Sequence, residues 1–357
     1  MVYLDYAATH PYVKYLSSAY GPFFNLNANY AYKEKHLLSG AEDRVKKAIG
    51  AKSGKIIFGG TSSQLIENLM NAIERDPFYS HYCVGSCFEH DSCDRFLTNK
   101  CDTINEFETF LQDHRGFRMV AMWMGVNNLT GEIFPIEKVG GLCHKYLDTF
   151  YICDATALVG HAPIPKNIDN WCSAFIIDGH KLGTELGIGC CWISDELDKW
   201  LDGFKLHGTP NLAGALALTQ AVEDACDKYL LHDKMQDWLD LMIKLNDELI
   251  QNGIEFNLIP DSSDYDEIPF TYAINAIRLP GFNADALQQF LASKQVYISI
   301  GGSACAEKHD YRVLNAYELS NDEASEVIRV SFGEDNSVED VEALVEGIKN
   351  FKELYIK

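Results

Sequence analysis

The sequence predicts an α/β fold, with a large domain built on a mostly parallel β-sheet and a smaller C-terminal α+β domain. Near-continuous apolar runs end in polar residues, and helical stretches separate these runs. After about residue 252 the pattern is instead that of an α+β region, with short strands and helices. Apolar strands that alternate with helices are typical of a parallel sheet covered on both faces. We expect the large domain to span 14–230, and the smaller one to combine 1–13 with 231–357.

The predicted elements follow in a regular order. A helix comes first, then a short strand that ends in Gly-Gly, then an amphipathic helix, at 41–51, 55–60 and 62–75. Apolar runs predict the other strands of the large domain at 82–87, 119–127, 149–156, 173–179 and 187–194. A helical tract then runs from about 212 to 252. Short strands and helices complete the smaller domain, ending with an amphipathic helix at 338–355.

Composition and charge exclude several function classes. The 357 residues carry a net charge of −22, which disfavours nucleic acid and membrane surfaces as direct ligands. The N-terminus has no signal-peptide pattern and no run approaches 18 apolar residues, so we expect a cytoplasmic protein. The eleven cysteines lack the paired spacing of a zinc site, so we expect no metal and mostly inert thiols.

Polar residues at the predicted strand ends suggest a pyridoxal phosphate site. Lys181 follows the apolar run 174–177, where it is either a solvated lysine or a Schiff-base amine. His180 is either a core imidazole or part of the same site. Asp154 ends the preceding strand, and a carboxylate there suits the protonated ring nitrogen of pyridoxal phosphate.

Three further positions fit such a cofactor. Ser62 and Ser63 open a helix after Gly-Gly and suit either a phosphate or an ordinary N-cap. His90 follows a strand and could stack on a ring. Asn128 offers an amide to a ring hydroxyl or a substrate carboxylate. The order of these residues on successive strand ends is more specific than any one of them.

The sequence resembles the cysteine desulfurases, which are pyridoxal phosphate enzymes of the class V aminotransferase group with fold type I. The resemblance covers almost the whole chain. The stretches that carry it are "VYLDYAATHP", "FGGTSSQLIEN", "EHDS", "VNNLTGEIFPI", "DATALVGHAPI", "GHKLGTELGIG", "GTPN", "IGGSACA", "YRVLNA" and "VIRVSFGEDNSVEDVE".

The resemblance implies a role for each matching residue. Lys181 binds the cofactor aldehyde, Asp154 pairs with the ring nitrogen, and His90 stacks on the ring and moves protons. Asn128 approaches the ring hydroxyl and the substrate carboxylate. The phosphate is held by Ser62, Ser63 and His180, with Thr209 reaching across from the second subunit of a homodimer.

The family also implies a reaction. Arg329 binds the α-carboxylate of L-cysteine as a bidentate fork. Lys181 removes the α-proton, and the Cys305 thiolate attacks the substrate sulfur. The products are L-alanine and a persulfide on Cys305. That sulfur passes to an acceptor protein, for iron–sulfur cluster assembly or thiolation.

The chain departs from the family pattern at several places. Ala157 replaces a glutamine that hydrogen-bonds the ring hydroxyl, and Asp178 replaces a serine that binds the phosphate. A carboxylate beside a phosphate is unfavourable unless it is protonated, turned away or paired with a base. The segment before "GTPN" is short, and five residues separate Cys305 from "YRVLNA". A short loop limits how far a persulfide could travel.

Two alternatives to a desulfurase remain open. The chain could be a lyase, epimerase or aminotransferase of the same group, in which Cys305 is incidental. It could also be a scaffold of low activity that keeps the fold and a partner surface, an alternative motivated by Ala157 and Asp178.

Overall fold

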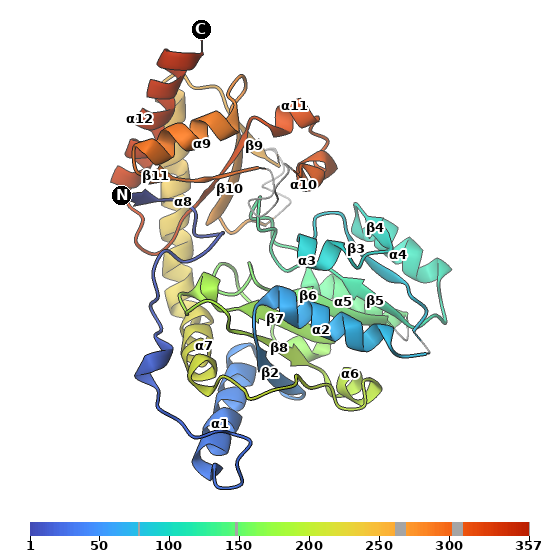
Figure 1. Cartoon of the computed structure of the whole chain (residues 1–357). Coiled ribbons are helices and arrows are strands. Elements are labelled where there is room, and N and C mark those ends of the chain that lie inside the picture. The colour runs from blue at the N-terminus through green and yellow to red at the C-terminus, as the bar shows by residue number, and fades with distance from the viewer. Residues whose placement is uncertain (78, 147–148, 261–268, 302–309, 357) are drawn as a thin grey trace. The chain divides into compact units, whose positions relative to one another are not determined.

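The computed structural model describes residues 1–77, 79–146, 149–260, 269–301 and 310–356 (Figure 1). The chain divides into two compact units. Unit 1 comprises Met1–Pro11, Asn127–Ile133 and His232–Lys357, and unit 2 comprises Tyr12–Val126 and Phe134–Leu231. The short segment Asn127–Ile133 therefore packs within unit 1, although the chain on either side of it belongs to unit 2.

Unit 2 contains a seven-stranded sheet in the order β2-β8-β7-β6-β5-β3-β4. Strand β8 is antiparallel to both of its neighbours, and the other strands run parallel, which confirms the predicted mostly parallel sheet. The strands are β2 (Lys55–Gly59), β3 (Cys83–Ser86), β4 (Asn99–Cys101), β5 (Met119–Met122), β6 (Thr149–Asp154), β7 (Ala174–Asp178) and β8 (Gly189–Ile193).

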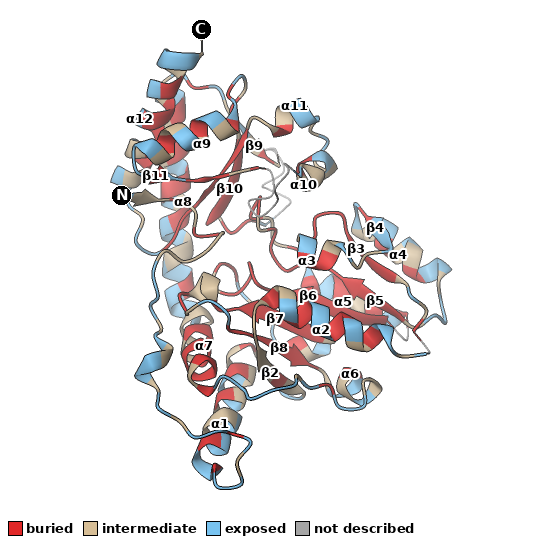
Figure 2. Cartoon of the chain, in the orientation of Figure 1, coloured by how far each residue is buried: buried red, intermediate tan, exposed pale blue. Residues whose placement is uncertain are grey.

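Helices cover this sheet, and the central strands are buried (Figure 2). Helix α2 buries its apolar face in the core, where Leu65, Leu69 and Ile73 are fully covered. Burying each such side chain stabilises the fold by about 1.5–3 kcal/mol. The helices of unit 2 are α1 (Tyr32–Ala48), α2 (Ser62–Glu74), α3 (Asp91–Asp94), α4 (Ile104–Asp113), α5 (Ile136–Lys145), α6 (Asp195–Trp200) and α7 (Leu212–Ala225).

The helical tract predicted at 212–252 consists of two helices. Helix α7 ends at Ala225, and α8 (Lys228–Gln251) begins after a short break. The Asp227 side chain accepts hydrogen bonds from the backbone N–H groups of Tyr229 and Leu230, at 2.9 and 3.2 Å. A carboxylate on the first N–H groups of a helix is a favourable start signal, so Asp227 explains why a new helix begins here.

Unit 1 contains a four-stranded antiparallel sheet in the order β12-β13-β10-β9 and a parallel pair, β1-β11. Its strands are β1 (Val2–Tyr3), β9 (Asn257–Ile259), β10 (Ile274–Arg278), β11 (Val296–Tyr297), β12 (Ser299–Ile300) and β13 (Val327–Ser331). Its helices, besides most of α8, are α9 (Ala284–Ser293), α10 (Arg312–Ala316), α11 (Asn321–Ala324) and α12 (Val338–Tyr355).

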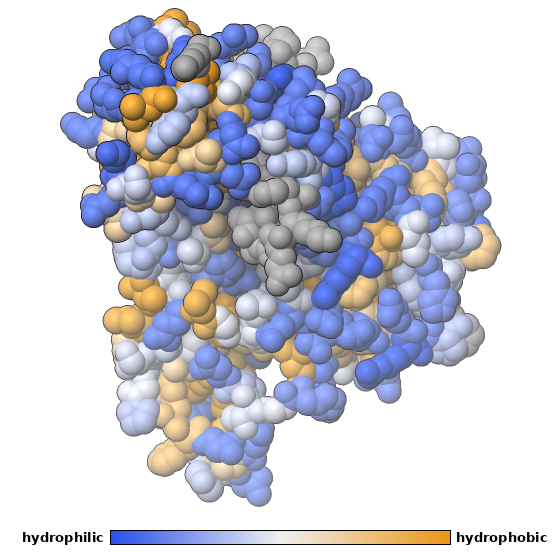
Figure 3. All heavy atoms as spheres, turned by 45° about the horizontal axis from the view of Figure 1, so that its top comes forward, coloured by the Kyte–Doolittle hydropathy of each residue, from blue (hydrophilic) through white to orange (hydrophobic). Residues whose placement is uncertain are grey.

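Hydrophilic residues predominate on the face of the molecule shown in Figure 3, as the large excess of Asp and Glu leads one to expect. Within the described ranges, no helix combines the length and apolar character needed to cross a membrane.

Candidate active site

The carboxyl edge of the unit 2 sheet collects most of the predicted cofactor residues. Strands β3, β5, β6 and β7 are parallel, and β2 shares their direction because β2 and β7 are both antiparallel to β8. Asp154 is the last residue of β6 and Asp178 is the last of β7. His90 follows β3, Ser62 opens the helix after β2, and Lys181 comes shortly after β7. Ligands of open α/β sheets bind at this edge.

Gly189 allows the backbone at this edge to pack tightly. It pairs with Asp178 on one side and with Gly59 on the other. A Cβ atom at Gly189 would lie 2.7 Å from the carbonyl oxygen of Gly60 and 2.8 Å from that of Ile177. A side chain does not fit there, so glycine is required for the loop after β2 to approach the end of β7.

The Asp178 carboxylate is buried, with 1% of its side chain exposed. It binds His180, which follows β7, and Ser62, at the start of α2. Its Oδ1 lies 2.6 Å from Nδ1 of His180 and accepts the His180 backbone N–H at 3.3 Å. Its Oδ2 accepts the backbone N–H of Ser62 at 2.7 Å. Asp178 therefore joins two of the predicted phosphate-binding residues to each other.

The pKa of Asp178 lies below its ordinary value of 3.8. Burial alone would raise this pKa, but hydrogen bonding to His180, the His180 charge and hydrogen bonds from Ser62 outweigh burial. The carboxylate is therefore ionised at neutral pH. A carboxylate beside a phosphate is expected to be protonated, turned away or paired with a base. Asp178 is paired with a base, His180.

Asp178 should make folding stability depend on pH in the acid range. A carboxyl group whose pKa is lowered by folding stabilises the protein above its unfolded-state pKa, and that stability is lost as pH falls through the folded-state pKa. We expect Asp178→Asn to lower the free energy of unfolding by about 1–3 kcal/mol at pH 7. The difference from wild type should shrink below about pH 4. Urea unfolding of the cofactor-free protein at several pH values measures this.

The exposed Asp195, at the start of α6, is the matched control, and Asp195→Asn should have little effect at any pH. A loss of stability in Asp178→Asn that stays constant from pH 7 to pH 3 would show that the ionised carboxylate is not the source of the effect.

Asp154 ends β6, and Lys181 follows the adjacent parallel strand β7. Asp154 is buried, and its Oδ1 accepts the Thr156 backbone N–H at 3.0 Å. The Thr156 hydroxyl is also buried, and the structure records no hydrogen-bond partner for it among the described residues. Lys181 is half-buried in the short 3₁₀ helix His180–Leu182. That helix ends at Gly183, whose φ of 84° lies in the left-handed region that favours glycine.

The first turn of α2 is capped by Thr61, not by Ser62 or Ser63. The Thr61 side chain accepts the backbone N–H of Gln64 at 3.3 Å. The N-cap is therefore Thr61, which precedes the two serines in the same run of small hydroxyl residues, and the phosphate role of Ser62 and Ser63 stays a prediction. His90 is the N-cap of α3, with its Nδ1 accepting the Ser92 backbone N–H at 3.2 Å.

Unit 1 holds the two predicted substrate-binding residues, and they lie together. Nη1 of Arg329 donates to the backbone carbonyl of Asn128 at 2.9 Å. Nη2 donates to Asp5 at 2.9 Å and to Ser299 at 3.0 Å. The Arg329 side chain is buried, and its Nε–H has no hydrogen-bond partner among the described residues. A buried guanidinium N–H without an acceptor suits a carboxylate ligand.

Tyr317 fixes the segment that carries Asn128. Its hydroxyl donates to Glu132 at 2.6 Å and accepts the Asn127 side-chain amide at 3.1 Å, with the Thr130 hydroxyl 3.2 Å away. Burial and the nearby Glu132 charge raise the pKa of Tyr317 well above 10, so its hydroxyl stays protonated and can donate. These contacts explain why 127–133 belongs to unit 1.

Residues 98–344 match the family model described as Aminotransferase class-V. The chain belongs to this family. The match covers more than half of the chain and includes both Asp154, at the end of β6, and Lys181, shortly after β7. The predicted membership of the class V group is confirmed.

Individual known proteins resemble the chain over nearly its full length. It is 26% identical to "Cysteine desulfurase IscS" of Dictyoglomus turgidum, over 95% of this chain and 91% of that protein. A solved "NIFS-LIKE PROTEIN" superimposes with a TM-score of 0.83 at 18% identity, covering 99% of both chains. The apo structure of a cysteine desulfurase from Thermococcus onnurineus NA1 gives 0.76 at 19% identity, covering 98% and 94%. These structural matches confirm the predicted fold.

The residues of this class-V chain fit pyridoxal phosphate at most positions. Three features lie at one edge of the sheet. They are the amine of Lys181, the buried carboxylate of Asp154 and the start of the 13-residue helix α2. The Thr156 hydroxyl beside Asp154, for which the described residues offer no hydrogen-bond partner, also suits a polar ligand. The exception is Asp178, an anion that already binds Ser62 and His180, which are predicted to bind the phosphate.

Other predicted residues lie outside these contacts. Cys305, the predicted nucleophile, falls outside the described residues. Thr209 is exposed, and its hydroxyl accepts the Asn27 amide at 3.2 Å, so its predicted role in a second subunit stays a prediction. Ser63 is half-buried beside Ser62, and Ala157 is buried.

Of the ten cysteines that the structure describes, nine are buried and Cys226 is half-buried. Burial raises the pKa of Cys226 to about 12 and that of Cys191 to about 12. Burial also raises the pKa of six others, which are Cys83, Cys93, Cys101, Cys143, Cys172 and Cys190. Since the thiolate is the nucleophile, these eight thiols are poor nucleophiles at neutral pH.

Sequence reasoning missed three polar residues that organise the site. Asp5 binds Arg329 from the opposite end of the chain, and Tyr317 binds the segment 127–133. Glu89 is fully buried and accepts hydrogen bonds from the Ser86 hydroxyl and the Met124 backbone N–H, both at 2.7 Å. The charge of Glu89 within an apolar stretch was the one available signal for a buried, hydrogen-bonded carboxylate.

Proposed function

We propose that the chain is a pyridoxal phosphate-dependent cysteine desulfurase that converts L-cysteine to L-alanine and transfers the sulfur to Cys305. The observation that carries the proposal is that Asp154 ends β6 and Lys181 follows the adjacent parallel strand β7. An amine for the cofactor aldehyde and an acid for its ring nitrogen are thereby available at one sheet edge. The near full-length similarity to cysteine desulfurases supports the same substrate.

Pyridoxal phosphate, when bound, supplies an electron sink for a carbanion at the substrate α-carbon. In this proposal Asp154 would keep the ring nitrogen protonated, and His90 would stack on the ring. Ser62, Ser63 and His180 would hold the phosphate, together with Thr209 from a second copy of the chain.

Four residues are proposed to handle the substrate. Asn128 and Arg329 hold the α-carboxylate, for which the Arg329 Nε–H is available. Lys181 takes the α-proton and later returns a proton to the carbon skeleton. The Cys305 thiolate attacks the substrate sulfur, so that an S–S bond forms as the C–S bond breaks. The three-carbon product leaves as alanine, and the persulfide sulfur passes to an acceptor protein.

Cys305→Ala tests the sulfur-transfer step. We expect sulfur release from L-cysteine to fall by at least about 10²-fold, because nine of the ten described thiols are buried and the tenth, Cys226, is half-buried with a raised pKa. Cofactor binding, measured by absorbance, should be unchanged. Cys226→Ala is the matched control, because Cys226 is the most accessible of the described cysteines, and it should keep full activity.

Unchanged sulfur release in Cys305→Ala would sink the desulfurase proposal and favour another class-V reaction. A chain that binds no cofactor at all would favour the scaffold alternative, for which the specific motivation is Asp178 on the phosphate donors.

A further inference from the structure

We propose that Asp178 is an internal anion that takes the place of a phosphate at the start of α2, so that this chain binds the cofactor's phosphate group weakly. The inference rests on the proposed function in taking pyridoxal phosphate as the cofactor. It assigns Asp178 as a residue that sets how strongly phosphate binds.

Asp178 already holds the donors that the phosphate is predicted to use. One carboxylate oxygen accepts the Ser62 backbone N–H at 2.7 Å, and the other lies 2.6 Å from Nδ1 of His180. A hydrogen bond from the Ser62 side chain also lowers the pKa of Asp178. Ser62 and His180, which are predicted to bind the phosphate, therefore already stabilise the Asp178 carboxylate.

The remaining N–H groups of the first turn of α2 are mostly occupied. Gln64 donates to the Thr61 side chain at 3.3 Å, and Leu65 donates to the Thr61 carbonyl at 3.0 Å. With Ser62 bound to Asp178 and Gln64 bound to Thr61, two N–H groups of this first turn already have acceptors. A phosphate ordinarily binds several such groups at a helix N-terminus.

The negative charge of Asp178, like its hydrogen bonds, is expected to weaken phosphate binding at the start of α2. A carboxylate at a helix N-terminus neutralises the positive end of the helix dipole, which would otherwise attract a phosphate. Asp178 is 1% exposed, so solvent screens its charge poorly from a second anion at the same site. An incoming phosphate must therefore displace Asp178 or bind beside it against like-charge repulsion.

The test compares phosphate binding in wild type, Asp178→Ser and Asp178→Asn, using the cofactor-free full-length protein. Inorganic phosphate is titrated by calorimetry, and folding is checked by thermal unfolding without phosphate. We expect Asp178→Ser to bind phosphate at least about tenfold more tightly than wild type, which is about 1.4 kcal/mol. Asp178→Asn should show a smaller gain. The exposed Asp195→Ser, at the start of α6, should bind phosphate as wild type does.

A second arm separates this inference from the proposed function. Pyridoxal phosphate and pyridoxal are titrated into the same proteins, and the visible absorption band of the lysine-bound cofactor is recorded. Asp178→Ser should strengthen pyridoxal phosphate binding by about tenfold and change pyridoxal binding by less than about twofold.

Folded Asp178→Ser and Asp178→Asn proteins with wild-type or weaker phosphate affinity would overturn the inference. If Asp178→Ser does not fold, Asp178→Asn decides alone. A gain in phosphate binding with no cofactor band in any protein would uphold the role of Asp178 and contradict the proposed function.

Discussion

Replacing Lys181 with alanine is expected to abolish covalent cofactor attachment and to lower L-cysteine turnover by at least about 10³-fold. Lys181 lies shortly after β7, at the sheet edge where Asp154 ends β6. The same amine is proposed to bind the cofactor and to move the α-proton, so its loss removes two functions together. Absorbance spectroscopy and an alanine assay measure the two effects separately.

The exposed Lys199, in α6 of the same unit, is the matched control. Lys199→Ala should leave both the absorption band and the turnover at the wild-type level. Borohydride reduction and peptide mass analysis locate the modified lysine. A cofactor found on a different lysine, or turnover that survives in Lys181→Ala, would contradict the assigned role.

Replacing Arg329 with methionine is expected to destabilise the protein by about 3–5 kcal/mol. Arg329 is buried, and its removal leaves the Asp5 carboxylate, the Ser299 hydroxyl and a backbone carbonyl without their donor. Methionine keeps much of the side-chain volume, so the loss reports the lost polar contacts more than a cavity. Urea unfolding of the cofactor-free protein measures the change.

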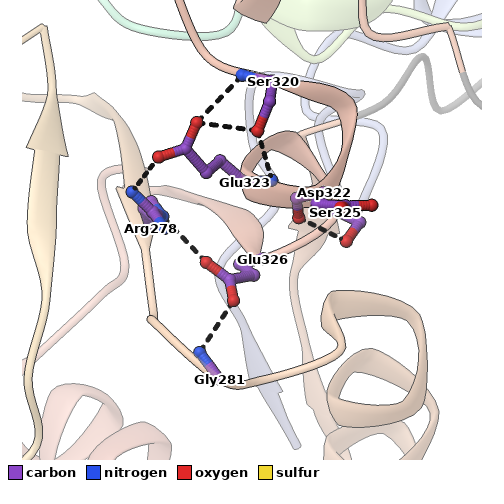
Figure 4. Close-up of polar contacts among 7 residues, drawn as sticks. All are labelled: Arg278, Gly281, Ser320, Asp322, Glu323, Ser325 and Glu326. Atoms are coloured by element: carbon purple, nitrogen blue, oxygen red, sulfur yellow. Dashed lines mark hydrogen bonds and ion pairs between the residues drawn. The ribbon is translucent and has the colours of Figure 1, made fainter.

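Arg278, in the neighbouring strand β10, provides a matched control (Figure 4). It donates to Glu326 and Glu323, each at 2.8 Å, but its side chain is 25% exposed. Such partly solvated pairs contribute about 1 kcal/mol or less, so Arg278→Met should have a much smaller effect. If both variants lose the same free energy of unfolding, the burial of Arg329 does not account for the stability that its contacts provide.

Much of the unit 2 fold could be predicted because its signals are local. The apolar runs at 149–156 and 173–179 contain the buried strands β6 and β7, and the polar residues at their ends lie at one sheet edge. Hydrophobic patterning fixes strand position, and a parallel arrangement fixes which ends meet. The break before α8 was missed because its signal is a single residue, Asp227, within a continuous helical pattern.

The contacts that define the site could not be predicted, because they join distant parts of the chain. Asp178 and Ser62 are 116 residues apart, and Arg329 and Asp5 are 324 apart. The sequence identified Asp178 as an unusual residue beside a phosphate site. It could not show that His180 and Ser62 both bind this carboxylate, since that depends on how closely the β2 loop approaches β7 past Gly189.

The most direct test of the proposed desulfurase is to incubate the cofactor-loaded protein with L-cysteine, then to quantify alanine and measure the mass of the peptide that contains Cys305. The proposal predicts alanine as the carbon product and a Cys305 peptide heavier by one sulfur atom. L-cysteine consumption that yields a different carbon product, or alanine formation with no added sulfur on Cys305 at any time point, would contradict it.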